Sequence, residues 1–531
     1  MYAGGPENTV SRRNLLMAGM SVAVWTAASM VQGCGSETVN QIGGTTSLPA
    51  PPDQGTGNVV GPTPPAFVQP DVLRSVSGTL STTLVHRVAN NMVGPNPVTL
   101  RSYNGKLTGP TLRVKPGDTL RILVDNQFPA NPDPVKPANL NQPHQLNTTN
   151  LHTHGLHVSP QANSDNIFVE IDPGSTFQYE YQIPADHPPG THWYHPHKHG
   201  SSAVQLFSSM AGALIVEGGL DEVPAIKAAR DLVYLITELN INNVTGDVPA
   251  WSGAVNPTPF GNQPGQRFLL VNGSLVPSLS AFSGEVIRLR VINGSVRTAV
   301  PFSIAGHTLN IISLDGIALP TMRQASSIVL TPAGRADILI RCGAPGNYNI
   351  TRLADDSLGN MDNPIPLGSL QVLNTVVTMD LPDKLPPQPY PNILASELTN
   401  QNVTVLNWEA NAPGAEAAAP FFNNQNFTIN LKHFNPMVVD HSIPLNSVLE
   451  WELINTSNVG HPFHIHINPF MVVSVNNVPL PEPEWHDTFN IPKGGRIRIR
   501  HRFEDFRGMY VLHCHILIHE DLGMMQVVEV T

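Results

Sequence analysis

One strand pattern occurs three times along this chain, with the same length and the same kinds of ends. The copies are residues 117–126, 284–293 and 446–455, and each runs from a turn residue to an asparagine. Alternating apolar residues inside each copy predict β-strands, and repetition along a chain indicates repeated structural units. A second pattern, a Gly followed four residues later by a Val, ends each unit: Gly212 and Val216, Gly368 and Val372, Gly523 and Val527.

These repeats predict an all-β protein of three consecutive β-sandwich domains, at residues 76–220, 221–375 and 376–531. Composition agrees, because 50 Pro and 42 Gly among 531 residues disfavour long helices, in which each Pro costs about 3 kcal/mol. The hydrophobic share of 41% is large enough for sizeable cores and excludes general disorder. Only three cysteines occur, which excludes a disulfide framework.

Charge also limits the classes of partner. Lys and Arg number 29 and Asp and Glu number 40, giving a formal charge of −11. No basic surplus exists to neutralise phosphates, so nucleic acid is excluded as a main partner. We expect a monomer that acts on small molecules or metal ions.

The N-terminus, residues 1–34, predicts an export signal. Twin arginines at positions 12 and 13 precede an uncharged apolar run over residues 15–31, as in twin-arginine leaders. Cys34 follows a sequence similar to a lipoprotein processing site, in which Gln32 fits poorly, so lipidation of Cys34 and cleavage elsewhere both stay open. Residues 35–75, rich in Gly, Thr and Pro, predict a flexible linker. We therefore expect a periplasmic or cell-surface protein.

Histidine is the unusual residue, with 21 copies concentrated in a few short clusters. Pairs spaced two residues apart point to the same side of a strand. Neutral imidazole is the commonest metal ligand in proteins, so eight such side chains indicate metal binding. The four pairs are His152 and His154, His195 and His197, His464 and His466, and His513 and His515.

Cys514 lies between two of these histidines, so its side chain points away from theirs. On that opposite face it can join His461 and His519, with Met524 as a weak axial ligand. Two imidazoles, one thiolate and a distant thioether are the ligand set of a blue-copper electron-transfer site.

The motifs HTHG, WYHPH, HPFHIH and HCHILIHEDLGMM together resemble the four signature motifs of three-domain bacterial multicopper oxidases, the laccase-like and copper-efflux-oxidase-like family. The resemblance covers residues from about 76 to 531 and implies cupredoxin-like Greek-key sandwiches with four copper ions. It assigns the ligands as follows: His461, Cys514, His519 and Met524 to type 1 copper; His152 and His464 to type 2; His154, His195, His197, His466, His513 and His515 to the type 3 pair.

The middle domain lacks the corresponding residues. Residues 190–197 align without gaps to residues 508–515, with Pro196 in the place of Cys514. The matching segments of the middle domain, residues 300–305 and 346–353, contain none of the ligand histidines. We therefore expect a metal-free spacer in the middle, and a trinuclear site where the first and third domains meet.

The resemblance implies an enzyme that takes single electrons from phenols or aromatic amines at type 1 copper. The electrons then pass through Cys514 to its neighbours, and O₂ is reduced to water at the trinuclear site. Two carboxylates are candidate proton donors by resemblance, Glu520 and Asp165. Asp165 lies two residues further from its motif than in copper-efflux oxidases.

Three other points stay open at this stage. The acidic stretch 355–362 suits a metal oxidase acting on Cu(I) or Mn(II), or it is a solvated loop. A non-catalytic copper-binding or structural relative is a more distant alternative. The segment Trp485-His486-Asp487 is a candidate to line the approach to type 1 copper.

Overall fold

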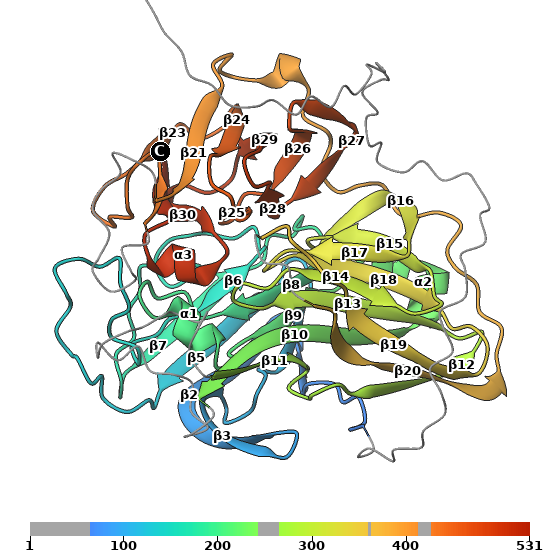
Figure 1. Cartoon of the computed structure of the whole chain (residues 1–531). Coiled ribbons are helices and arrows are strands. Elements are labelled where there is room, and N and C mark those ends of the chain that lie inside the picture. Colours follow the sequence, from blue (N-terminus) through green and yellow to red (C-terminus); the bar gives the residue numbers. More distant parts are fainter. Residues whose placement is uncertain (1–63, 243–264, 359–362, 412–425) are drawn as a thin grey trace, which may run out of the picture. The chain divides into compact units, whose positions relative to one another are not determined.

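The computed structural model describes residues 64–242, 265–358, 363–411 and 426–531. The predicted export signal, including Cys34, and residues 35–63 of the predicted linker lie outside these ranges. The described residues form six β-sheets, with helices of at most five residues between them (Figure 1). The all-β prediction is confirmed, with 51% of the structure in strands and 5% in helices. None of the described helices is long and apolar enough to cross a lipid bilayer.

The first pair of sheets spans residues 72–216. One sheet contains, in spatial order, β3 (Asn96–Tyr103), β2 (Thr79–Val93), β5 (Thr119–Asn126) and β7 (Thr176–Gln182). The other contains β1 (Val72–Arg74), β4 (Thr111–Val114), β9 (Gly212–Val216), β8 (Gly190–His195) and β6 (His152–His154). Helix α1 (Ser202–Leu206) lies between β8 and β9 in the chain.

The second pair spans residues 230–376, after the short helices η1 (Gly219–Glu222) and α2 (Pro224–Ala228). Its six-stranded sheet contains β11 (Gly265–Val271), β10 (Arg230–Asn242), β13 (Val286–Gly294), β18 (Arg335–Arg341), β15 (Leu309–Leu314) and β16 (Ile317–Ala325). Its five-stranded sheet contains β12 (Ser278–Ser283), β20 (Ile365–Val376), β19 (Gly346–Arg352), β14 (Val300–Ile304) and β17 (Ser327–Leu330).

The third pair spans residues 404–530, after η2 (Ala395–Glu397). Its six-stranded sheet contains β22 (Phe427–Ile429), β21 (Thr404–Ala410), β24 (Ser447–Asn455), β29 (Arg496–Phe503), β26 (Phe470–Val475) and β27 (Val478–His486). Its five-stranded sheet contains β23 (His441–Ile443), β31 (Met525–Val530), β30 (Gly508–Cys514), β25 (His461–Ile465) and β28 (Thr488–Ile491). Helix α3 (Leu517–Asp521) separates β30 from β31.

The end of the predicted linker differs from the expectation. Phe67 donates its backbone N–H to Ser278 at 2.9 Å, and Gln69 bonds the backbone of Val233. Strand β1 then pairs in parallel with β4. Residues 64–75 are thus fixed to the first two domains, and the prediction of a flexible linker is wrong for them, because several of their backbone groups are hydrogen-bonded to strands of these domains.

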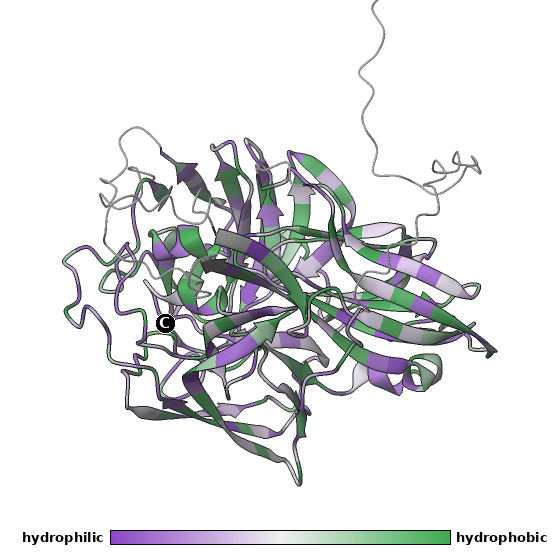
Figure 2. Cartoon of the chain, turned by 60° about the horizontal axis from the view of Figure 1, so that its bottom comes forward, coloured by the Kyte–Doolittle hydropathy of each residue, from purple (hydrophilic) through white to green (hydrophobic). Residues whose placement is uncertain are grey.

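Figure 2 shows hydrophobic and hydrophilic residues alternating along many strands, the pattern of sheets with one face in a core. The repeated segments become β5, β13 and β24, and each pairs in parallel with a strand that comes earlier in the chain: β2, β10 and β21. Such pairing of non-consecutive strands requires crossover connections, which the three domains share.

The strands that hold the histidine motifs pair in one common register. In the third domain Phe463 lies opposite Cys514, and in the second Phe302 lies opposite Arg352. Arg352 therefore occupies the position of the cysteine. At the next position of the strand pairing, each of the three domains has an equivalent pair of residues. These pairs are His152 with His195, Ser303 with Thr351, and His464 with His513.

The asparagines that end the repeated strands, Asn126, Asn293 and Asn455, also act alike. Each side-chain amide donates to two backbone carbonyls, and each Oδ1 accepts the N–H two residues further on, at 2.7–3.2 Å. All three asparagines are buried, so each provides hydrogen-bond partners for buried backbone groups that are not paired within a sheet. The asparagine fixes the direction of the loop that follows.

Candidate metal centres

The predicted type 1 residues meet in the core of the third domain. Cys514 Sγ lies 3.5 Å from His461 Nδ1 and 3.6 Å from His519 Nδ1. Two ligands at about 2.0 Å (nitrogen) and 2.3 Å (sulfur) from one shared ion, as in zinc sites, would lie about 3.6 Å apart. The three side chains therefore fit a single metal ion without rearrangement.

The surroundings orient these ligands. Ser457 Oγ bonds His461 Nε2 at 2.9 Å, which leaves Nδ1 facing the sulfur. The ring of His519 stacks on Phe427, with centroids 3.8 Å apart. Met524 is fully buried, and its backbone carbonyl accepts the N–H of Cys514 at 3.1 Å. Together with His461 and His519, Cys514 and Met524 form what we call the Cys514 cluster.

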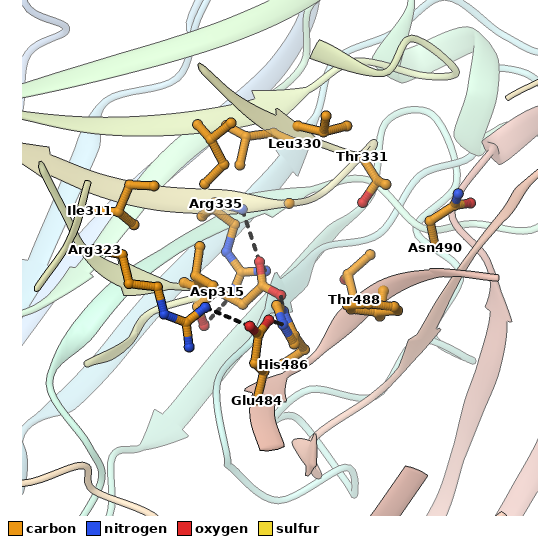
Figure 3. Close-up of a pocket in the computed structure, with 15 residues that line it drawn as sticks. Ile311, Asp315, Arg323, Leu330, Thr331, Arg335, Glu484, His486, Thr488 and Asn490 are labelled. Carbon is orange, nitrogen blue, oxygen red and sulfur yellow. Dashed lines mark hydrogen bonds and ion pairs between the residues drawn. The ribbon is translucent and has the colours of Figure 1, made fainter. Parts of the chain in front are cut away.

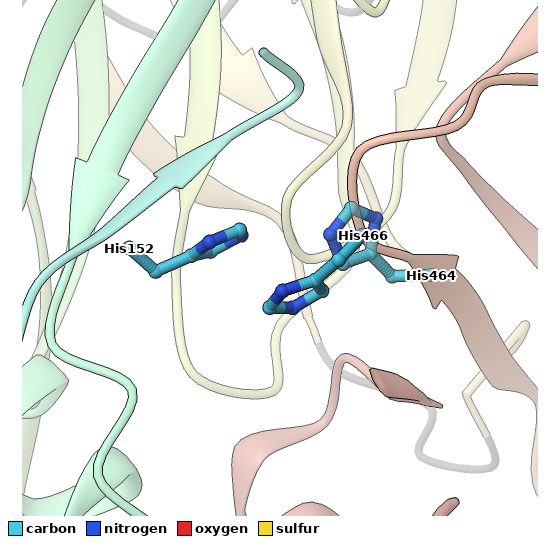
Figure 4. A group of neighbouring side chains, drawn as sticks. All are labelled: His152, His464 and His466. Carbon is cyan, nitrogen blue, oxygen red and sulfur yellow. The ribbon is translucent and has the colours of Figure 1, made fainter. Parts of the chain in front are cut away.

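The eight paired histidines come together in a second group, the eight-histidine cluster. All eight are buried, four from the first domain and four from the third. His152 stacks on His466 with centroids 3.9 Å apart, and His154 stacks on His464 at 3.8 Å. Figure 4 shows the ring of His152 facing those of His464 and His466. His152, His464 and His466 form one of several groups whose ligand atoms lie within 4.8 Å of one another.

The free nitrogens of this cluster fit metal ions. Nδ1 of His152, His195 and His464 bonds an oxygen, while Nε2 of each is buried without a partner. Burial comes first among the causes that lower the histidine pKa values, to about 3 for His195 and about 4 for His197. Neutral rings present lone pairs, and buried polar atoms without partners are costly unless something binds them. Copper ions at these nitrogens would satisfy them.

Cys514 connects the two clusters. Its sulfur contacts His461 and His519, while its chain neighbours His513 and His515 belong to the eight-histidine cluster. Nε2 of His513 lies 3.1 Å from Nε2 of His197, across the interface of the first and third domains. The structure thus brings the predicted histidine and cysteine ligands together in the two expected groups, and it places the backbone of Met524 against Cys514.

Asp165 lies directly against the eight-histidine cluster. Its carboxylate accepts from His152 Nδ1 at 2.9 Å and from the backbone N–H of Thr153 at 2.9 Å. Burial raises the pKa of Asp165 to about 7, although the bonds from Thr153 oppose the shift. The carboxylate fixes the tautomer of His152, with Nε2 free to bind a metal.

Glu520 occupies the corresponding place on the other side. Its Oε2 lies 3.1 Å from His513 Nδ1, and its Oε1 lies 3.5 Å from His197 Nδ1 and accepts from Ser202 Oγ at 3.0 Å. The next residue, Asp521, accepts the backbone N–H groups of Gly200 and Ala203 at 2.6 and 2.9 Å. Helix α3 is thereby joined to the start of α1, and Glu520 is held between the two domains.

Sequence reasoning missed one contact of this centre. Asp487 lies 3.2 Å from His154 Nε2, and its backbone carbonyl accepts from His464 Nδ1 at 2.7 Å. The carboxylate is held by both terminal nitrogens of Arg335, a fully buried residue of the middle domain. The middle domain therefore acts on the centre and is more than a spacer. No motif marks Arg335, which lies 152 residues from Asp487.

The segment Trp485-His486-Asp487 is also placed differently from the expectation. His486 bonds Asp315 at 2.8 Å and Glu484 at 3.3 Å, in a pocket of about 370 Å³ between the second and third domains. Figure 3 shows Arg323 facing Glu484, with His486 beside them. With Asp487 against His154, the segment lies by the eight-histidine cluster, and the expectation that it lines the type 1 approach is wrong.

Comparisons with known proteins agree on one family. Three sequence models described as multicopper oxidase match residues 85–220, 237–374 and 400–531. The multicopper oxidase mco of Staphylococcus aureus is 27% identical over 441 residues, covering 81% of this chain and 83% of that protein. The laccase of Bacillus subtilis is 25% identical, covering 82% and 91%. A solved multicopper oxidase of Campylobacter jejuni, described as a metallo-oxidase, superposes with a TM-score of 0.72 at 25% identity, covering 88% and 96%.

Proposed function

Because the chain belongs to the multicopper oxidase family, which binds four copper ions and uses O₂ with a reducing substrate, we propose that its own substrates are phenols and aromatic amines. Copper supplies one-electron chemistry at the Cys514 cluster and the four-electron reduction of O₂ at the eight-histidine cluster. The residues of the chain bind the substrate, provide the route for electrons and carry the protons.

The observation that carries this proposal is the exposure of His519. His461 and Cys514 are fully buried, whereas His519 is partly exposed and stacks on Phe427. An electron therefore enters most directly through the His519 edge. Phe427, itself buried, covers one face of this ring, so the exposed edge of His519 lies beside an apolar residue, which favours a flat apolar substrate.

From this entrance the chain offers one short covalent route inward. The sulfur of Cys514 contacts His519, and the backbone of Cys514 continues directly into His513 and His515. Protons reach the inner site through carboxylates in this proposal. Glu520 receives a proton at Oε1 from the direction of Ser202 Oγ, and its Oε2 adjoins His513 Nδ1.

Replacing Cys514 with Ser tests the proposal. We expect the variant to lose the blue-copper absorbance band and all O₂ uptake with a phenol, because no thiolate joins the two clusters. Cys342, the other cysteine in the described residues, is buried in the middle domain, so Cys342→Ser is the matched control and should keep both. Retained oxidation in Cys514→Ser would refute the electron route.

A second candidate function is the oxidation of Cu(I) or Mn(II). The Campylobacter jejuni relative is described as a metallo-oxidase. The acidic stretch 355–362 also lies near the Cys514 cluster, because the carbonyl of Ser357 packs so closely on Gly460, next to His461, that a Cβ added to Gly460 would lie 2.3 Å from it. Residues 359–362 lie outside the described residues. The described carboxylates of this stretch already have partners, since Asp355 bonds Ser357 and Asp356 pairs with Lys493 at 2.7 Å.

A pair of variants separates the two functions. Phe427→Leu removes the ring stacked on His519, so it should lower the oxidation of a phenol and of Cu(I) alike and serves as the reference for damage to the Cys514 cluster. Asp356→Asn should leave phenol oxidation unchanged. O₂ uptake with each substrate is the measurement. A large loss of Cu(I) oxidation in Asp356→Asn, with phenol oxidation intact, would favour the metal oxidase.

We also propose that the protein acts outside the cytoplasm, after export by the twin-arginine pathway. The arginine pair at positions 12 and 13 and the apolar run after it support this. Changing both arginines to lysine should leave the protein in the cytoplasmic fraction. A lipid on Cys34 would be detected as a mass increase that is lost in Cys34→Ala.

A further inference from the structure

A pocket between the first and third domains has no part in the chemistry proposed above. It encloses about 300 Å³, and none of the residues that line it belongs to the Cys514 cluster or the eight-histidine cluster. Its walls combine the polar residues Lys136, His144, Glu170, Lys198 and His199 with five apolar ones. The apolar residues are Leu140, Ile167, Phe168, Phe434 and Pro436.

Lys198 forms part of the wall of this pocket. The residue is 2% exposed, and within the described ranges its Nζ has no hydrogen-bond partner. Lysine is almost never buried in this way without a partner, because an unpaired charge removed from water is costly. The structure therefore contains a positive charge that a ligand could balance.

Among the described residues, no neighbouring acid forms an ion pair or a hydrogen bond with Lys198 Nζ. Glu170, at the rim, pairs with Lys136 at 2.5 Å. Asp521 accepts two backbone N–H groups, those of Gly200 and Ala203. Because Lys198 contributes one unpaired positive charge to the wall of the pocket, we expect the ligand to carry one negative charge.

The size and walls of the pocket indicate the rest of the ligand. An apolar cavity of about 150 Å³ is large enough to bind benzene, so this pocket has room for one substituted ring. Phe168 and Phe434 line the pocket, and a ligand that carries an aromatic ring would bury that ring against them.

We propose that this pocket binds a small aromatic carboxylate, whose carboxylate pairs with Lys198 Nζ and whose ring lies against Phe168 and Phe434. The site is separate from the electron entrance at His519. It goes beyond the proposed oxidation, because a ligand without a phenolic hydroxyl can bind there and is not a substrate.

Calorimetric titration of the copper-loaded enzyme with benzoate at pH 7 tests the site. We expect one benzoate per chain. Benzyl alcohol, which has the same ring without the charge, should bind at least tenfold more weakly to the unchanged protein. Lys198→Met should weaken benzoate binding at least tenfold. Lys227→Met, which removes an exposed lysine that is paired with Glu222 outside the pocket, is the matched control and should change it less than threefold.

Three results would overturn the proposal. They are equal binding of benzoate and benzyl alcohol, unchanged benzoate affinity in Lys198→Met, and displacement of benzoate by equimolar chloride or phosphate, which would make this an inorganic anion site. Copper content and the blue band establish that Lys198→Met is folded. If it is not, the comparison of benzoate with benzyl alcohol on the unchanged protein decides. Because benzoate is not oxidised, failure here leaves the proposed function untouched.

Discussion

At the scale of single residues, polar side chains next to the ligands determine how the centre works. Three ligand rings are oriented by a hydrogen bond to the ring nitrogen that does not face the centre. The partners are Ser457 for His461, Asp165 for His152 and the backbone carbonyl of Asp487 for His464. Such contacts select the tautomer of a ligand and hold its ring. From sequence, Asp165 was expected as a proton donor and Asp487 as part of a segment lining the type 1 approach, but none of the three contacts with the ligands was predicted, because no spacing marks them.

His486 is a residue whose charge affects stability. Burial opposes its charged form, but hydrogen bonds to Asp315 and Glu484 outweigh burial and raise the pKa of His486 to about 9. A pKa raised above the unfolded value of about 6.5 means that the stabilisation is complete below pH 6.5 and is lost as the pH rises through 9. The full effect is on the order of 3 kcal/mol.

Unfolding in denaturant at pH 6 and at pH 10 checks this. The protein should lose stability between the two values, and His486→Gln should remove most of that loss. Arg323 pairs with Glu484 in the same pocket, and Arg323→Gln is the control variant. An identical pH dependence in His486→Gln and the unchanged protein would contradict the assignment.

At the scale of elements, strand patterns were predictable and their connections were less so. The repeats located β5, β13 and β24, and the internal alignment placed Thr351 and Arg352 where the ladder shows them, opposite Ser303 and Phe302. The alternation of apolar and polar residues is a local signal of a strand, because side chains two residues apart lie on the same face. The ordered segment 64–75 was missed, because Gly and Pro suit an extended edge segment as well as a free one.

The terminal asparagines allow a comparison between domains. Asn293→Ala should cost about 2–4 kcal/mol, because two carbonyls and one N–H lose buried partners, and should leave the blue band unchanged. Asn455→Ala should cost as much and also shift the band. Asn455 Oδ1 accepts from Ser457 Oγ at 2.7 Å, and Ser457 holds His461. Absorbance spectra and denaturant titrations of both variants are the test, and a shift in neither or in both would refute it.

At the scale of the whole molecule, the interface between domains completes the site. The sequence indicated that the first and third domains share the eight histidines. It could not indicate that Arg335 of the middle domain reaches Asp487, because pairs so far apart in sequence are set by the packing of whole sandwiches. Asp521 in α3, which bonds the start of α1, is a second case of this kind.

Arg335→Met should therefore destabilise the protein strongly. Asp487 would remain buried without its partner, which costs about 3–5 kcal/mol, and His154 would lose its fixed neighbour. Arg323→Met removes a partly exposed arginine nearby and should cost less than about 1 kcal/mol. Denaturant titration measures both. Copper content should fall only in Arg335→Met, and equal stability losses in the two variants would count against this role.

The position of Arg352 has a consequence for how the three domains mature. Where the third domain needs a thiolate and an added ion, the second holds a guanidinium, whose Nε donates to the carbonyl of Ala299 at 2.9 Å. This cation is part of the polypeptide and is present as soon as the chain is made. The second domain can thus fold completely in a cell that lacks copper. The first and third domains can then pack against a folded second domain before they bind their copper ions.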